Sequence, residues 1–181
     1  MTMADTIAVM HSGRVEQLGS PRELYERPVS RYVANFLGQS NCLDGTVVEV
    51  GGDTTVVDVH GVRLALPGRH GRPGAAQSFG VRPEKAVVLA RTGGSPDPRL
   101  SNGLPGVVTD VSFTGLSIQY VVRTGWGQDL AVFAQNDGAD AAASRGDAVL
   151  VAWRPEHAFA LRADVPAPAD EPASVLATAS P

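Results

Sequence analysis

The sequence predicts a mainly β protein with two OB-like five-stranded halves, preceded by a short β-hairpin and two helices. Three observations lead to this prediction. Short segments of alternating apolar and polar residues recur between residues 41 and 161. Glycine- and asparagine-containing turns separate these segments. The segments also form two matching sets, which indicates an internal duplication.

The hairpin is expected at the start of the chain. Residues 7–10 form a short apolar run, and residues 14–18 follow a glycine-containing turn. Two such runs around a tight turn are typical of paired antiparallel strands.

Two short helices should follow, because each has a start signal. Ser20 precedes Pro21, and Glu23 completes a capping box. Ser30 is placed to cap the second helix, and Gly38 is placed to end it. Residues 1–40 are therefore expected to form a unit distinct from the strands that follow.

The duplication is clearest at the two ends of each half. Residues 45–50 (GTVVEV) match residues 106–111 (GVVTDV), and residues 82–89 (RPEKAVVL) match residues 154–161 (RPEHAFAL). Strands are expected in the first half at 45–50, 54–59, 62–66, 77–82 and 86–89. Strands are expected in the second half at 106–112, 116–122, 129–134, 147–153 and 158–161.

Five short antiparallel strands suit a small OB-type barrel. A unit of roughly 60 residues buries only about 60% of its unfolded surface, so the two halves should pack against each other. We place them at 41–92 and 104–162 within one domain, 41–162. Residues 93–105 are expected to form a linker, and 163–181, rich in alanine and proline, a disordered tail.

Composition excludes several functions. The chain has 15 basic residues, but Lys85 is the only lysine, and it lies between Glu84 and Ala86 rather than in a phosphate-binding GxxxxGK[ST] loop. No segment has the roughly 20 consecutive apolar residues of a membrane-spanning helix, and the net charge is −4 with scattered arginines, unlike a nucleic-acid-binding surface. We therefore expect a cytoplasmic protein that neither inserts into a membrane nor binds nucleic acid.

The candidate site is the repeated Arg-Pro-Glu triplet. On an extended backbone Arg82 and Glu84 would share a face, as would Arg154 and Glu156. One interpretation makes each pair a structural ion pair at a barrel rim. The other makes the arginines contacts to a partner domain or to an anion, because a planar guanidinium suits a carboxylate or oxyanion.

Other residues carry less functional signal. Cys42 is the only cysteine, and we expect it to be a packed side chain rather than a reactive thiol. His60, His70 and His157 have no ligand-spaced partners, so no metal site is predicted. Trp126 lies between two glycines, where it could stack a ligand but is expected to fold onto its own barrel.

Several motifs resemble one family. Residues 5–17 (DTIAVMHSGRVEQ), 19–28 (GSPRELYERP) and 36–41 (FLGQSN) resemble the end of the ATPase domain in importer-type ABC transporter subunits. The duplicated region, including residues 80–84 (GVRPE), resembles the TOBE domain that follows in that family. The FLGQSN junction is most similar to the spermidine/putrescine branch.

The resemblance has consequences for function. The family hydrolyses ATP with Mg²⁺ through Walker, signature and switch-histidine motifs, which lie N-terminal to the region matched here. No catalytic, cofactor or metal residue is therefore assigned to this chain, which is expected not to be an enzyme by itself. The resemblance implies membrane subunits and a second ATP-binding subunit as partners, at the inner face of the cytoplasmic membrane. The transported substrate is not determined by this region.

Two other functions remain open from the residues. The chain could be a stand-alone OB-type module that binds a small ligand or oxyanion, with Arg82 or Arg154 as ligands. It could also bind single-stranded nucleic acid on an OB face, which predicts strongly salt-dependent association.

Overall fold

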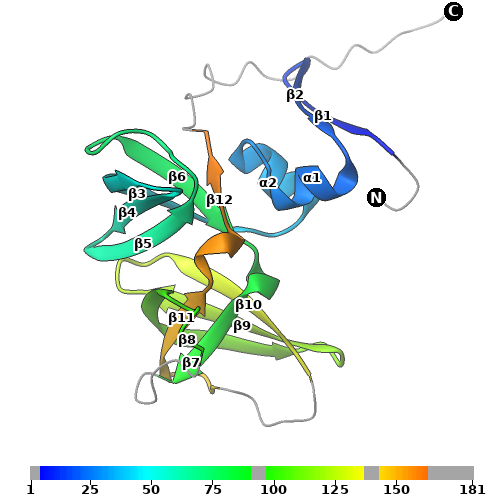
Figure 1. Ribbon diagram of the computed structural model, residues 1–181. Coiled ribbons are helices and arrows are strands. Elements are labelled where there is room, and N and C mark those ends of the chain that lie inside the picture. Colours follow the sequence, from blue (N-terminus) through cyan, green and yellow to red (C-terminus); the bar gives the residue numbers. More distant parts are fainter. Residues whose placement is uncertain (1–4, 91–96, 137–142, 163–181) are drawn as a thin grey trace, which may run out of the picture.

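The computed structural model describes residues 5–90, 97–136 and 143–162. More than half of these residues lie in strands, and apart from one hairpin the strands form two five-stranded antiparallel sheets, which confirms the predicted fold class. In Figure 1 the two sheets lie one above the other, and the helices lie beside the upper one. The tail predicted at 163–181 falls outside the described residues.

A hairpin and two helices begin the described chain. Strands β1 (Ile7–His11) and β2 (Arg14–Gly19) pair with each other. They are followed by the helices α1 (Pro21–Glu26) and α2 (Arg31–Leu37). The hydroxyl groups of Ser20 and Ser30 accept hydrogen bonds from the third following amides, at 3.2 and 3.4 Å, so both predicted N-caps are confirmed.

The two sheets have the same strand order. The first sheet follows the order β12-β6-β3-β4-β5, and the second follows β7-β11-β8-β9-β10. The first sheet consists of β3 (Asn41–Gly51), β4 (Thr54–Val59), β5 (Val62–Pro67), β6 (Ala76–Val81) and β12 (Ala158–Leu161). The second consists of β7 (Ala86–Ala90), β8 (Asn102–Phe113), β9 (Ser117–Thr124), β10 (Asp129–Gln135) and β11 (Ala148–Trp153).

The prediction that each half keeps its own fifth strand is wrong. Strand β7 follows the first half in sequence but pairs with β11 of the second sheet, and β12 crosses in the opposite direction to pair with β6. The crossings are made by two 3₁₀ turns, η1 (Pro83–Lys85) and η2 (Pro155–His157). A proline in each turn has no N–H to continue the ladder, so the chain leaves one sheet there and enters the other (Figure 1).

The duplication is visible in details of the long strands. Each carries a β-bulge at the same place, after Val47 in β3 and after Val108 in β8, where an extra residue bends the strand. Gly45 and Gly106, 61 residues apart, lie where an added Cβ would collide with the neighbouring strand. Glycine is required at both positions for the close approach that curls each sheet.

One core joins the two halves. Trp153, Tyr120 and Phe79 are the largest fully buried side chains, and they belong to a single apolar cluster with residues from both sheets. The expectation that the halves pack against each other is therefore confirmed. The predicted linker is wrong in part, because β8 already begins at Asn102.

Asparagines tie each half to the edge of the other. The side-chain amide of Asn41 donates to the carbonyl of Ala131 at 2.7 Å and accepts from its N–H at 2.8 Å. Asn102 makes the same two bonds to Ala65, at 2.8 and 2.7 Å. Ala131 and Ala65 lie on the edge strands β10 and β5, so each amide pairs backbone groups that the ladder leaves unpaired.

Candidate functional site

Arg82 lies where the α1–α2 segment contacts the two-sheet barrel, a contact region that we call the seam. It follows β6 and precedes η1, and its side chain is only 3% exposed. Burying a guanidinium is costly unless its donors find acceptors. Its partners therefore show what holds the seam together.

The acceptors for Arg82 come from the ends of both helices. Its Nη2 donates to the carbonyl of Tyr25 in the last turn of α1, at 2.8 Å. Its Nη1 lies near four oxygen atoms at and beyond the end of α2: the carbonyls of Ala34 (2.8 Å), Gly38 (3.1 Å) and Gln39 (3.3 Å), and the hydroxyl of Ser40 (2.7 Å). The carbonyls at a helix C-terminus lack intrahelical donors and carry partial negative charge. One cation therefore satisfies the C-terminal ends of two helices.

Aromatic rings complete the seam. The guanidinium carbon of Arg82 lies 4.0 Å from the centre of the Tyr25 ring and 5.6 Å from that of Phe159. Phe159 on β12 also packs with Ala34 of α2. Burial lowers the pKa of Arg82 below its ordinary value, because desolvation disfavours the charged form.

Glu84 supports the seam without contacting Arg82 directly. It accepts a hydrogen bond from the hydroxyl of Tyr25 at 2.7 Å. Burial, followed by this bond, raises the pKa of Tyr25. The expected extended backbone of the triplet is wrong, because Pro83–Lys85 form a 3₁₀ turn, yet Arg82 and Glu84 both contact Tyr25.

The second triplet has the same turn but a different partner. Arg154 is 30% exposed, and its Nη2 lies 2.9 Å from a carboxylate oxygen of Asp97. Glu156 is exposed. Among the described residues, neither arginine forms an ion pair with the glutamate of its own triplet.

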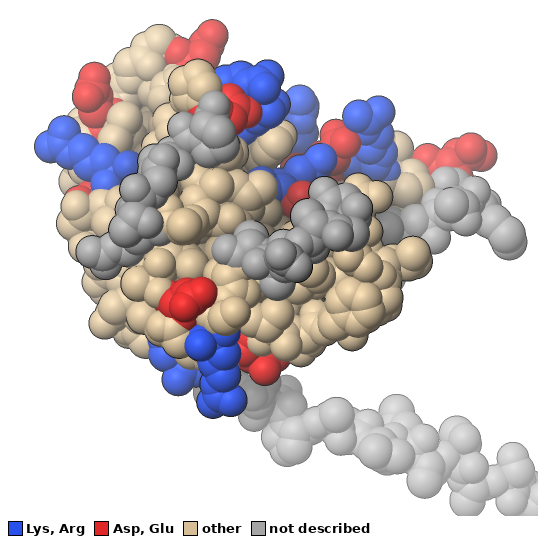
Figure 2. Space-filling model, turned by 90° about the horizontal axis from the view of Figure 1, so that it is seen from below, with Lys and Arg blue, Asp and Glu red and all other residues tan. Residues whose placement is uncertain are grey.

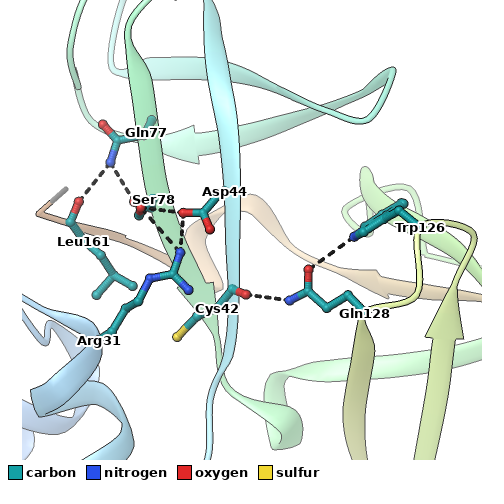
Figure 3. A network of polar contacts seen from close by, with 8 residues as sticks. All are labelled: Arg31, Cys42, Asp44, Gln77, Ser78, Trp126, Gln128 and Leu161. Carbon is teal, nitrogen blue, oxygen red and sulfur yellow. Dashed lines mark hydrogen bonds and ion pairs between the residues drawn. The ribbon is translucent and has the colours of Figure 1, made fainter. Parts of the chain in front are cut away.

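A second polar contact joins α2 to the first sheet (Figure 3). Arg31 forms an ion pair with Asp44, which also accepts a hydrogen bond from the hydroxyl of Ser78 at 2.6 Å. Burial opposes ionisation of Asp44, but the hydrogen bonds from Ser78 and Arg31 lower its pKa below the ordinary value. The carboxylate therefore stays charged beside the arginine.

The turns of the two halves also meet. Gln128 donates to the carbonyl of Cys42 at 2.7 Å, and the Trp126 indole donates to Gln128 at 3.3 Å (Figure 3). The Trp126 ring stacks on His60, with the ring centres 4.5 Å apart. The expectation that Trp126 folds onto its own barrel is thus modified, because its ring partner is a turn of the other half.

A cleft of about 760 Å³ opens along the seam. The end of α1 and the following loop form one wall. The other wall comes from the β5–β6 loop, η1, η2 and the start of β12. Arg82 and Glu156 of the predicted set line this cleft, together with Lys85 and His157, which directly follow the two triplets at equivalent positions.

In the part of the chain that the structure describes, no group of three or more histidine, cysteine, aspartate or glutamate side chains could hold a metal ion. The described helices include none that is long and apolar enough to span a membrane.

Sequence reasoning missed the seam residues other than the two triplets. Tyr25 and the carbonyls at the end of α2 have no sequence signature of a contact to Arg82, which is far away in the chain. Asn41 and Asn102 did have a signal, because they are separated by the same 61 residues as Gly45 and Gly106.

Comparisons with known proteins identify relatives. Residues 79–161 match the TOBE domain family. The chain is 42% identical over 169 residues to the spermidine/putrescine import ATP-binding protein PotA of Acidothermus cellulolyticus, a match covering 89% of this chain and 42% of that protein. It is 33% identical over 128 residues to the Fe(3+) ions import ATP-binding protein FbpC of Brucella abortus, covering 71% of this chain and 34% of that protein. The chain thus spans less than half the length of these curated relatives.

A solved structure shares the fold. The cytoplasmic molybdate-binding protein ModG, with molybdate bound, matches with a TM-score of 0.56 and 15% sequence identity, over 65% of this chain and 92% of that chain. At this identity the likeness concerns the fold alone.

Proposed function

Because this chain carries a TOBE domain and corresponds to the C-terminal part of an importer-type ABC ATP-binding subunit, we propose that it is the regulatory end of a subunit that drives solute uptake. The Arg82 seam is the observation that supports this role most directly. It fixes the α1–α2 segment, which resembles the end of the ATPase domain, to the TOBE barrel through several hydrogen bonds. A movement of one part would therefore be transmitted to the other.

An exposed apolar surface supports a larger assembly. Met10, Val15, Tyr32 and Phe36 are exposed although they are large and apolar or aromatic. Tyr32 lies between the others, with its hydroxyl donating to the carbonyl of Met10 at 3.2 Å and its ring 6.0 Å from that of Phe36. Surfaces of this kind are typical of interaction sites, and we propose that the ATP-binding part of the subunit covers it.

The remaining partners and ligands follow from the same proposal. ATP and Mg²⁺ would bind the ATP-binding part, and this chain alone is expected to hydrolyse no ATP. The assembled subunit would pair with a second ATP-binding subunit and with membrane subunits, at the inner face of the cytoplasmic membrane. A polyamine-like substrate is favoured, because the spermidine/putrescine relatives are more similar to this chain than the iron relative is.

The stand-alone oxyanion module is the second candidate, and the arginine contacts favour it less. Both terminal nitrogens of Arg82 already donate to oxygen atoms of the chain, and Arg154 already pairs with Asp97. Nucleic-acid binding also gains no support from the face seen in Figure 2. There, basic and acidic side chains lie in separate small groups around a broad uncharged area, not in one basic track.

A chimera tests the proposed role. This chain would replace the matching C-terminal region of the Acidothermus PotA relative, and ATP hydrolysis and spermidine uptake would be measured in the assembled transporter. We expect both activities to persist, and Arg82→Ala to reduce uptake per ATP hydrolysed. Arg63→Ala, on the exposed side of β5, is the control and should change neither. A folded chimera whose uptake and hydrolysis are both indifferent to Arg82→Ala would contradict the proposal.

A further inference from the structure

The cleft along the seam has the size and construction of a ligand site. Its volume of about 760 Å³ lies within the range of small-molecule pockets, roughly 300 to 1,000 Å³. Its walls come from segments far apart in sequence, the α1 end on one side and the barrel on the other. A molecule held there would contact both parts of the seam.

The charges that line the cleft are unequally compensated. Lys85 and Arg27 are exposed, and neither forms an ion pair with a described residue. The buried guanidinium of Arg82 donates only to neutral oxygen atoms. Two exposed cations therefore face the cleft without an ion pair to a described residue, whereas the charge of Arg82 is also acted on by the nearby Glu84 carboxylate.

Of the two acids that line the cleft, only one forms an ion pair with a described residue. Glu26 forms an ion pair with Arg22 at 2.8 Å. Glu156 acts on Arg99, whose pKa is raised mainly by Asp97 and further by Glu156. The lining therefore holds three cations and two acids, one of them already paired with Arg22, so an anion entering the cleft would meet net positive charge.

Apolar residues form much of the remaining wall. Pro28, Val29, Pro67, Ala158 and Phe159 all line the cleft, and the Phe159 ring centre lies 5.6 Å from the guanidinium carbon of Arg82. Pockets that combine an apolar lining with a few polar groups favour ligands that have both characters.

We infer that this cleft binds a small organic anion, a molecule with one carboxylate or phosphate group attached to an apolar body. The anionic group lies towards Lys85 and Arg27, and the apolar body lies against Phe159 and the prolines. Arg82 contributes positive charge instead of a hydrogen-bonding fork, because its terminal nitrogens are already occupied. The inference goes beyond the proposed transport role, since it concerns a ligand of this chain alone.

The single lysine makes a selective test possible. Reductive methylation with ¹³C-formaldehyde keeps the charge of a lysine, so it gives one lysine NMR signal, from Lys85, and a separate signal from the terminal amine as internal reference. Benzoate and phenyl phosphate are the anionic probes, and benzamide is the neutral control of the same shape. We expect both anions to move the Lys85 signal saturably and benzamide to leave it in place. Their relative affinities then tell which anionic group the cleft prefers.

Two matched variants complete the test. Arg27→Gln removes a cleft charge from an exposed side chain, so it should fold normally and weaken benzoate binding by about fivefold, as expected for a partly exposed charge pair. Arg63→Gln, which lies outside the cleft, should leave the affinity unchanged. Non-saturating shifts, equal shifts with benzamide, or equal weakening by the two variants would overturn the inference. Because no transporter is involved, these outcomes leave the proposed transport role untouched.

Discussion

The two Arg-Pro-Glu triplets have the same sequence and the same 3₁₀ turn, yet their arginines do different work. Arg82 is buried under two aromatic rings and holds the ends of two helices. Arg154 is partly exposed and pairs with Asp97 in the connection between the halves. The difference lies in what each half has beside it, because only the first has the α1–α2 segment docked on its outer face. A duplicated motif thus keeps its backbone geometry while its side chains take on separate roles.

The largest predicted effect distinguishes the two arginines. Arg82→Ala should reduce the free energy of unfolding by about 3 to 4 kcal/mol, because one buried and several part-buried carbonyls lose a charged donor. Arg154→Ala should reduce it by less than about 1 kcal/mol, as expected for a partly exposed ion pair. Urea unfolding measures the global effect, and hydrogen exchange in α1 and α2 shows any local undocking of the helices. Equal losses in the two variants would mean that the contacts of Arg82 contribute no more to stability than the ion pair of Arg154 does.

The hydrogen bonds of Asn41 and Asn102 to the edge strands should contribute equally to stability, unlike the contacts of the two arginines. Asn41→Ala leaves the buried N–H and carbonyl of Ala131 without these partners, and Asn102→Ala does the same to the part-buried N–H and carbonyl of Ala65. We expect each to reduce the free energy of unfolding by about 2 to 3 kcal/mol. Urea unfolding of both variants provides the measurement. A large inequality between them would show that the two halves are not energetically equivalent.

A smaller effect on stability is expected from one cross-strand pair of residues that differs between the two sheets. Gly80 faces Phe159 in the first sheet, whereas Ala152 faces Val87 in the second. A Cβ on Gly80 would come within 2.5 Å of the Phe159 ring, so Gly80→Ala should destabilise the fold by about 1 to 3 kcal/mol through overpacking.

A double variant that gives the first sheet the alanine–valine pair of the second sheet checks this explanation. In the double variant Gly80→Ala, Phe159→Val the clash is removed, so part of the lost stability should return relative to the sum of the single variants. Strict additivity in thermal or urea unfolding would show that the ring does not cause the cost. Ala152→Gly is the matched control in the second sheet.

The smallest predicted effect concerns acid. The pKa of Asp97 is lowered to about 2, first by the hydrogen bond from the Arg99 side chain and then by other contacts that include Arg154. A carboxyl group whose pKa is lowered by folding stabilises the protein above its unfolded pKa of about 4 and loses that contribution as the pH falls through the folded value. Stability should therefore fall between about pH 4 and pH 2 less steeply in Asp97→Asn than in the parent chain.

Carboxyl NMR titration gives the direct measurement of this pKa. Arg99→Gln should raise the pKa of Asp97 more than Arg154→Gln does, because Arg99 supplies the largest contribution. The opposite order would mean that Arg154 lowers the pKa of Asp97 more than Arg99 does. The contacts of Arg82 to neutral carbonyls should show no corresponding change in this pH range.

The local structure of this protein could be predicted from its residues alone. The caps at Ser20 and Ser30, the hairpin, most of the strands and the duplication could all be predicted, because each depends on residues close together in the chain. The triplets could be identified as special from their repetition, but their neighbours could not.

The pairing of the strands and the contacts of the arginines could be found only in the folded chain. Alternation of apolar and polar residues shows that a segment is a strand and which face is buried, but it does not name the partner strand. The exchange of β7 and β12, the hydrogen bonds of Asn41 and Asn102, and the seam around Arg82 all join residues distant in sequence. Such contacts form only when the whole chain has packed, so no local pattern specifies them.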